Sequence, residues 1–145
     1  MGKIVEMFEA EERVEKLTIR RQNAFRELAP AYIADIKERI RIEIEAFNLK
    51  LKASGRQVLP PKNKDTGVEL FFRPPVPIYE IVLSEHTETL RVLRGDACVA
   101  TLKLFVREDF TGLQAFSGMR ALTDDEVVDA VLTPFALEVH RVRRL

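Results

Sequence analysis

The first fifty residues carry an apolar pattern that repeats every eleven positions, and this repeat limits the fold more than any other feature. The repeating positions lie on three parallel lines: Val14, Phe25, Ile36 and Phe47; Leu17 and Leu28; and Ala29, Ile40 and Leu51. Because three turns of an α-helix span about 11 residues, these positions stay on one face of a nearly straight helix. The pattern therefore predicts a long helix over residues 1–53, with Gly55 as its stop.

A strand pattern competes over part of this segment. Ile40, Ile42, Ile44 and Ala46 alternate with charged residues, which is the period of a half-buried strand. We favour the helix, because no turn residue separates this stretch from the preceding helical pattern.

Pro30 lies in the middle of the predicted helix. An unbroken helix over residues 3–53 would be roughly 75 Å long, whereas a compact domain of 145 residues is roughly 38 Å across. Either the chain reverses at Pro30, or the excess length is covered by another copy. Residues 28–32 contain no Gly, Asn, Asp or Ser to make a tight reversal. We therefore expect a kinked helix and a homo-oligomer, most simply a dimer.

The remaining residues predict a single α+β domain over residues 1–145. Residues 54–67 form a polar connector, and residues 68–107 an antiparallel sheet of four strands (68–72, 78–83, 87–94 and 97–106). Residues 108–122 are expected to be a loop. Thr123 and Glu126 make a capping box that opens a helical region over residues 123–144. Pro134 should kink or split that region, and a strand over 137–142 is the alternative.

The pair Gly95-Asp96 fits a two-residue type II′ hairpin turn and so sets a register. By that count Leu93 faces Cys98, Val92 faces Val99 and Glu88 faces Lys103. Cys98 and Arg91 then point into the core, with Arg91 opposite Ala100. A buried guanidinium needs a counter-charge. Arg91, with Tyr79 nearby on the same sheet, is therefore the candidate binding site for a small anionic ligand.

Composition narrows the function classes. The chain has 23 basic and 23 acidic residues, and this balance argues against nucleic acid as the main partner. One cysteine excludes an intrachain disulfide, and no apolar run reaches the roughly 20 residues of a membrane helix. His86 and Glu88 alone make too few metal ligands. We expect a cytoplasmic protein with no metal, no cofactor and no catalytic constellation.

The second half of the first helix is apolar over more than the stripe that packing on one sheet requires, because Ile42 and Leu49 fall outside the main lines. The sequence therefore favours a non-enzymatic, homo-oligomeric binding or assembly module that uses this helix as its contact surface. An anionic-ligand protein or enzyme anchored by Arg91 is the alternative. The residues assigned to the oligomer interface are Phe25, Ile36, Ile40, Ile42, Phe47, Leu49 and Leu51.

Overall fold

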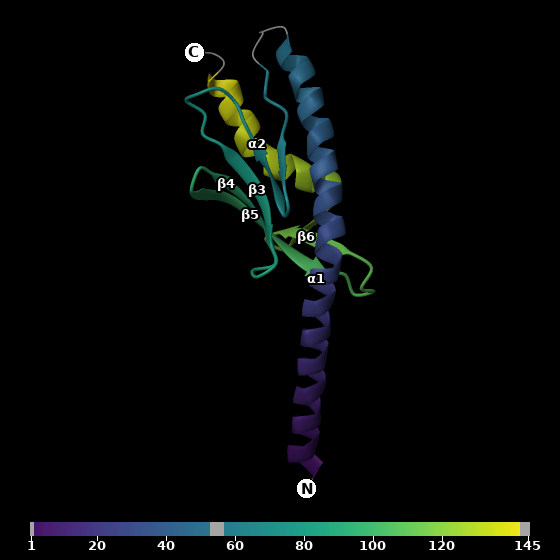
Figure 1. Ribbon diagram of the computed structural model, residues 1–145. Helices are drawn as coiled ribbons and strands as arrows, with labels where there is room; N and C mark the ends of the chain where they lie inside the picture. The colour runs from purple at the N-terminus through teal and green to yellow at the C-terminus, as the bar shows by residue number, and fades with distance from the viewer. Residues whose placement is uncertain (1, 53–56, 143–145) are drawn as a thin grey trace.

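The computed structural model describes residues 2–52 and 57–142, which form an α+β fold. The elements in chain order are α1 (Gly2–Leu51), β1 (Lys62–Lys64), β2 (Gly67–Leu70), β3 (Tyr79–Ser84), β4 (Thr89–Arg94), β5 (Ala97–Val106), β6 (Leu113–Ser117), β7 (Arg120–Leu122) and α2 (Asp124–Val142). The strands form one antiparallel sheet in the order β1 to β7, so each strand pairs with its neighbour in sequence. Figure 1 shows the C-terminal part of α1 running along the sheet, on the same side as α2. The N-terminal part of α1 extends past the end of the sheet.

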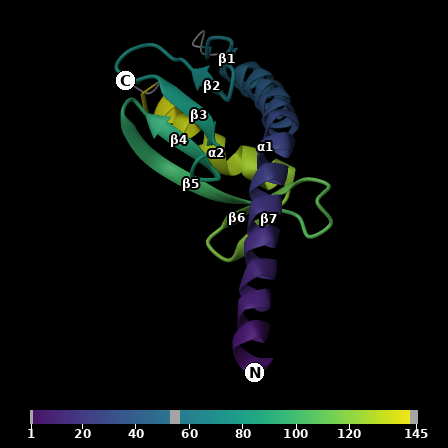
Figure 2. The same cartoon turned by 60° about the horizontal axis from the view of Figure 1, so that its bottom comes forward.

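Helix α1 confirms the long helix and excludes the strand over residues 40–46. It runs for 50 residues without a break at Pro30, which is exposed. Figures 1 and 2 show the axis of α1 bending but never reversing. The chain therefore does not form a helical hairpin here. The expected stop at Gly55 lies outside the described residues.

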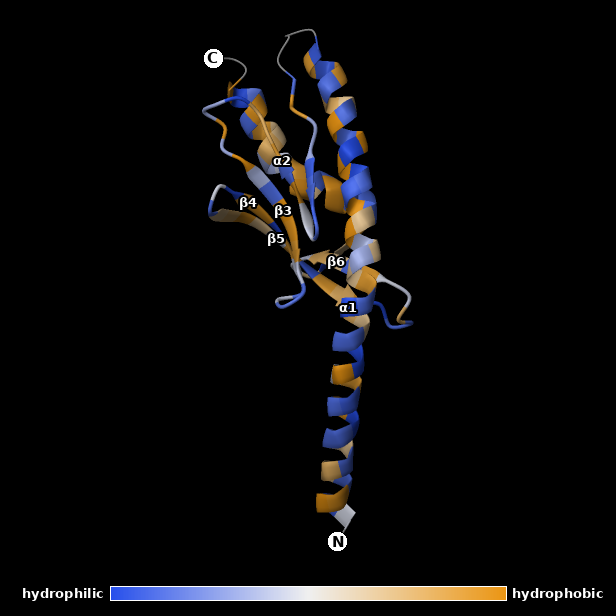
Figure 3. Ribbon diagram, in the orientation of Figure 1, coloured by the Kyte–Doolittle hydropathy of each residue, from blue (hydrophilic) through white to orange (hydrophobic). Residues whose placement is uncertain are grey.

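Only the second part of α1 is packed on its own protomer. The side chains of the following residues are buried against the sheet and α2: Phe25, Ala29, Ile33, Ile36, Ile40, Ile44 and Leu51. Residues 2–23, by contrast, are all exposed. They project beyond the sheet (Figure 1), and Figure 3 shows hydrophobic bands recurring among the hydrophilic ones along them. We call these 22 residues the overhang; at 1.5 Å per residue they are about 33 Å long.

The sheet has seven strands where the sequence predicts four. The four expected strands are β2 to β5, close to their predicted bounds. Strand β1 lies in the predicted connector, and its three residues are polar and exposed, so no apolar alternation marks it. Strands β6 and β7 lie in the predicted loop and form a hairpin around Gly118, which has a φ of 59°. Both are short, and only Leu113, Ala115 and Leu122 on them are buried.

A β-bulge corrects the predicted register of the β4–β5 hairpin. Leu93 faces Cys98 as expected, and Gly95 has the positive φ that the turn needs. The register then shifts by one, so Val92 faces Ala100 and Arg91 faces Thr101. The extra residue in β5 turns every later pair to the opposite face. Arg91 and Cys98 therefore lie on the outer face of the sheet, where Cys98 is exposed, instead of in the core.

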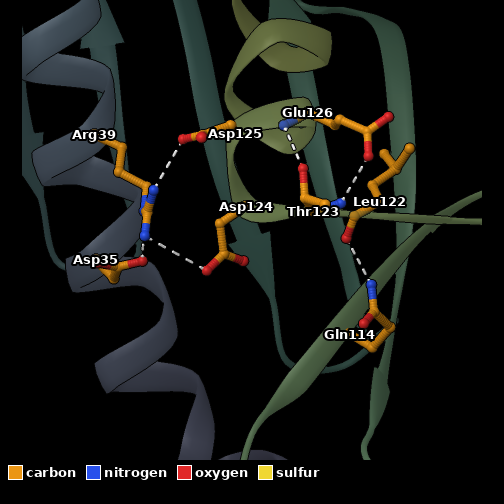
Figure 4. Close-up of polar contacts among 8 residues, drawn as sticks. All are labelled: Asp35, Arg39, Gln114, Leu122, Thr123, Asp124, Asp125 and Glu126. Atoms are coloured by element: carbon orange, nitrogen blue, oxygen red, sulfur yellow. Dashed lines mark hydrogen bonds and ion pairs between the residues drawn. The ribbon is translucent and has the colours of Figure 1, made fainter.

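Helix α2 begins at the predicted capping box. The Glu126 amide donates to the Thr123 hydroxyl over 3.2 Å, and the Thr123 amide donates to the Glu126 carboxylate over 3.1 Å (Figure 4). The helix continues through Pro134 to Val142, which excludes both a split and a strand over residues 137–142. The Thr133 hydroxyl donates to the Asp129 carbonyl one turn back and does not cap a second helix. Residues 143–145 lie outside the described residues.

Candidate interaction surface

An ion cluster fixes the direction of α1 relative to α2. Arg39 on α1 donates to Asp35 on its own helix and to Asp125 on the first turn of α2, both over 2.9 Å, and lies 3.7 Å from Asp124 (Figure 4). Below the cluster, Gln114 on β6 donates to the Leu122 carbonyl over 2.6 Å, which ties the β6–β7 hairpin to the start of α2. The Arg39 contacts join the packed part of α1 to the start of α2, and the overhang continues along the axis of that packed part.

A loop supports α1 at the base of the overhang. The turn between β5 and β6 brings Phe110, with a φ of 58°, against α1. The Arg20 guanidinium lies 4.1 Å from the centre of the Phe110 ring, within the range of a cation–π contact. Leu28, one turn beyond Ala24, is half-buried against the core. The base of the overhang is thus braced by the Phe110 loop, and its first buried neighbour along α1 is Phe25.

The overhang exposes many large apolar side chains. Their exposed fractions range from 44% to 82%, and they are Ile4, Val5, Met7, Phe8, Val14, Leu17 and Ile19. Met7, Ala10, Val14 and Leu17 follow one another at spacings of three, four and three, which places them on a single face. We call these four residues the overhang stripe. Within the described part of the chain, no other element covers it.

The two halves of the overhang carry opposite charge. Residues 2–12 contain one Lys and four Glu, a net charge of −3. Residues 13–23 contain one Lys, three Arg and one Glu, a net charge of +3. None of these side chains is in an ion pair among the described residues. The overhang is therefore an apolar stripe on a helix with one acidic and one basic half.

A hollow lies beside the base of the overhang, on the outer face of the sheet. It measures about 550 Å³, and its walls include Arg21 of α1, Phe105 and Arg107 near the end of β5, and Phe116 and Met119 of the β6–β7 hairpin. The Phe105 and Phe116 rings meet edge to face, with centres 5.3 Å apart. We call this hollow the aromatic groove. It combines an apolar floor with two cationic side chains and one acidic side chain, Glu108.

The predicted interface residues fall into a buried group and an exposed group. Phe25, Ile36, Ile40 and Leu51 are buried in the core of their own protomer, and Phe47 packs against that core. The sheet and α2 therefore already use these side chains. Ile42 and Leu49 are exposed.

The predicted interface residues lie on the half of α1 that the sheet and α2 cover. The strands are six to ten residues long where they are longest, so they span roughly 20–33 Å. A sheet of that size covers only half of α1. Because it follows the C-terminal end of α1 after a short connector, it covers the C-terminal half. The strand lengths and the short connector, both readable from the sequence, therefore indicate that the N-terminal half of α1 is left uncovered.

The predicted ligand site is not assembled. Arg91 lies half-buried on the outer face beside Cys98, and neither Arg91 nor Tyr79 lines any of the five surface hollows found among the described residues. The pKa of the Cys98 thiol is lowered, first by its hydrogen bond with the Thr101 hydroxyl and then by the nearby Arg91.

Tyr79 belongs instead to an internal clasp. Its hydroxyl donates to the Glu138 carboxylate on α2, which also accepts two hydrogen bonds from Arg94 over 2.7 and 2.9 Å. Burial, with this hydrogen bond, raises the pKa of Tyr79 to about 12, so the phenol keeps its proton. The three side chains join β3 and β4 to α2. We call them the Tyr79–Arg94–Glu138 clasp.

Two further findings concern the described residues. They contain no group of three or more His, Cys, Asp or Glu side chains close enough to hold a metal ion, and no helix among them is both long and apolar enough to cross a bilayer. Comparison with known proteins gives no match, whether with family models, with curated proteins or with solved structures. Function is therefore inferred from the residues of this chain alone.

Proposed function

We propose that this chain is a non-enzymatic, homo-oligomeric binding or assembly module, and that the overhang is its contact surface. The observation that carries this proposal is the overhang stripe, four residues on a helix segment whose 22 residues are all exposed in the described chain. Most helical stability in proteins comes from packing an apolar face, and the overhang stripe has no such packing within the described chain. A second helix laid on the stripe would provide that packing.

The chemistry of the stripe favours a helix as the partner. Its spacing of three and four residues is that of helices packed side by side, in which each side chain fits between residues of the facing helix. Burying a Met, Val or Leu side chain contributes roughly 1.5–3 kcal/mol, which is the scale of driving force that such a contact supplies per residue. The proposal includes a cytoplasmic location, since the exposed Cys98 thiol stays reduced there.

The oligomeric state of the full chain tests this proposal. Light scattering coupled to size exclusion should give the mass of a dimer or a larger closed oligomer at tens of micromolar. The variants Met7→Glu and Val14→Glu replace apolar stripe side chains with a charged residue that still favours a helix. They should be monomers in which the packed part of α1 is still helical.

Ile42→Glu and Leu49→Glu provide matched controls, because both sites are exposed apolar positions on α1 outside the overhang. These two variants should keep the mass of the wild type. A wild-type monomer at tens of micromolar would overturn the proposal. So would an oligomer that survives the stripe substitutions and dissociates with the controls.

A further inference from the structure

The charge pattern of the overhang gives the pairing a direction. We propose that the overhangs of two copies pair antiparallel, so that residues 2–12 of each copy lie against residues 19–29 of the other and the first turns of each copy enter the aromatic groove of the other. This inference rests on the proposed function, because it requires the overhang to be the contact surface. It adds the orientation of the pair and a second surface that the pair uses.

The net charges favour the antiparallel orientation of the two overhangs over the parallel one. A parallel pair would set a net −3 beside −3 and +3 beside +3. An antiparallel pair instead sets residues 2–12, with a net charge of −3, beside residues 19–29, which have three Arg and one Glu and a net charge of +2, and it does so twice. Facing helices are 8–10 Å apart, close to one Debye length at physiological salt, so these charges are only partly screened. Like charges on facing flanks are destabilising, and opposite ones also steer the encounter of the two copies.

The apolar positions also fit an antiparallel alignment. The stripe spacing continues past Leu17 with steps of four and three to Ala24. One antiparallel offset sets Met7 opposite Ala24, Ala10 opposite Arg21 and Val14 opposite Leu17. A large side chain therefore meets a small one in the outer pairs, and two medium side chains meet at the centre. Such alternation fills the space between facing helices.

The same offset brings the tip of each copy to the base of the other overhang. Ile4 and Phe8 lie off the stripe, on the flank of α1 that farther along packs on the sheet at Ala29 and Ile33. In an antiparallel pair the equivalent flanks of the two helices lie side by side, so the tip of one copy faces the sheet of the other.

The aromatic groove suits that tip. Its floor of Phe105 and Phe116 accepts apolar side chains such as Ile4 and Phe8. Its lining holds Arg21, Arg107 and Glu108, a net charge of +1, and the tip has a net negative charge beside its apolar side chains. The occupant that matches both the floor and the charge of the lining is the first turns of a second copy of this chain.

Distances between spin labels test the orientation in the full chain. With Cys98→Ser as background, single labels are placed at the tip by Lys3→Cys and near the middle by Glu15→Cys. At 1.5 Å per residue the antiparallel offset separates the two tips by about 38 Å. The two middle labels should lie within about 25 Å, since facing helices are 8–10 Å apart.

Each result has a separate meaning. A long tip distance with a short middle distance supports antiparallel pairing. Short distances at both sites mean a parallel pair, which overturns this inference and leaves the proposed function standing. No dipolar signal at either site, or long distances at both, means that the overhangs do not pair, which overturns the proposed function as well.

The charges and the groove are tested by dimer dissociation constants. Glu6→Lys with Glu9→Lys should weaken the dimer about tenfold at low salt, and adding Arg13→Glu with Arg20→Glu, on the same flank of the helix, should restore it. Lys50→Glu, outside the overhang, should change nothing. An unchanged constant for the first pair, or no restoration by the second, would overturn the electrostatic basis.

For the groove, Phe105→Gln should weaken the dimer about tenfold. Val99→Gln is the control, because Val99 is on the same strand and similarly exposed, at 43% against 47%. Equal effects of the two substitutions would overturn docking in the groove.

Discussion

The Tyr79–Arg94–Glu138 clasp predicts a stability loss with a defined pH dependence. Replacing Glu138 with Gln keeps the volume of the side chain and removes its charge. The Glu138 side chain is 17% exposed, whereas that of Arg94 is 46% exposed. Hydrogen bonds to charged groups contribute about 1.5–3 kcal/mol, and the exposure of Arg94 reduces this towards the range of surface pairs. We therefore expect Glu138→Gln to lower the free energy of unfolding by about 1–2 kcal/mol at pH 7.

The pH dependence follows from the pKa of the Glu138 carboxyl. That pKa lies below its ordinary value of 4.5, first because of the hydrogen bonds from Arg94, and also because of the Tyr79 hydroxyl. A carboxyl whose pKa is lowered by folding adds stability that is complete above the pKa of the unfolded chain and is lost as the pH falls through the folded value. The difference between wild type and Glu138→Gln should be constant above about pH 6 and shrink below pH 4.5.

Urea denaturation followed by circular dichroism measures this difference, at one fixed protein concentration because the stability of an oligomer depends on concentration. Arg94→Met and the double variant complete a cycle, in which the two single losses should sum to about 1 kcal/mol more than the loss of the double variant. A coupling free energy near zero would refute the clasp. So would a Glu138→Gln difference of the same size at pH 4 and pH 7.

Three further substitutions test other parts of the fold. Tyr32→Phe should leave stability unchanged or raise it by up to about 1 kcal/mol, because the buried Tyr32 hydroxyl has no hydrogen-bond partner among the described residues; a loss above 1 kcal/mol in urea denaturation would contradict this. Thr123→Ala should cost about 1 kcal/mol by removing the capping box of α2, while Thr111→Ala, outside any helix, serves as its comparison. Gly67→Ala should cost about 2–3 kcal/mol, because a Cβ at this position would overlap the Ile81 carbonyl oxygen; thermal melting close to that of wild type would show that β2 and β3 can separate to admit it.

The sequence predicts elements where a pattern extends over several turns or alternations. The eleven-residue repeat identifies α1 through Pro30, because burial of Phe25 to Leu51 on one face outweighs one missing hydrogen bond. The capping box locates the start of α2 for a different reason: Thr123 and Glu126 form a local hydrogen-bonding motif that the sequence shows directly. Strands such as β1 and β7 have three residues each, too few for a period to show.

The candidate site was harder to predict, because it depends on where long elements end relative to each other. The bulge beside Leu93 places Arg91 on the outer face of the sheet, whereas the predicted register places it on the core side. No residue at that point indicates a bulge in the sequence. The overhang stripe follows the same repeat as the buried part of α1, so the pattern alone does not separate Val14 from Phe25. Only the length of the sheet decides which half of the repeat is covered.

The two ends of the sheet influence how copies of this chain can associate. Strand β1, at one end, has three exposed residues, two of them lysines, and Lys64 is held by Glu80 of β3 over 2.8 Å. Strand β7, at the other end, is equally short. Brief, cationic edge strands are poor templates for a further strand from another molecule. Growth of the sheet from copy to copy, the route to open-ended fibres, is therefore disfavoured at both of its margins, so an association of copies would have to use other surfaces.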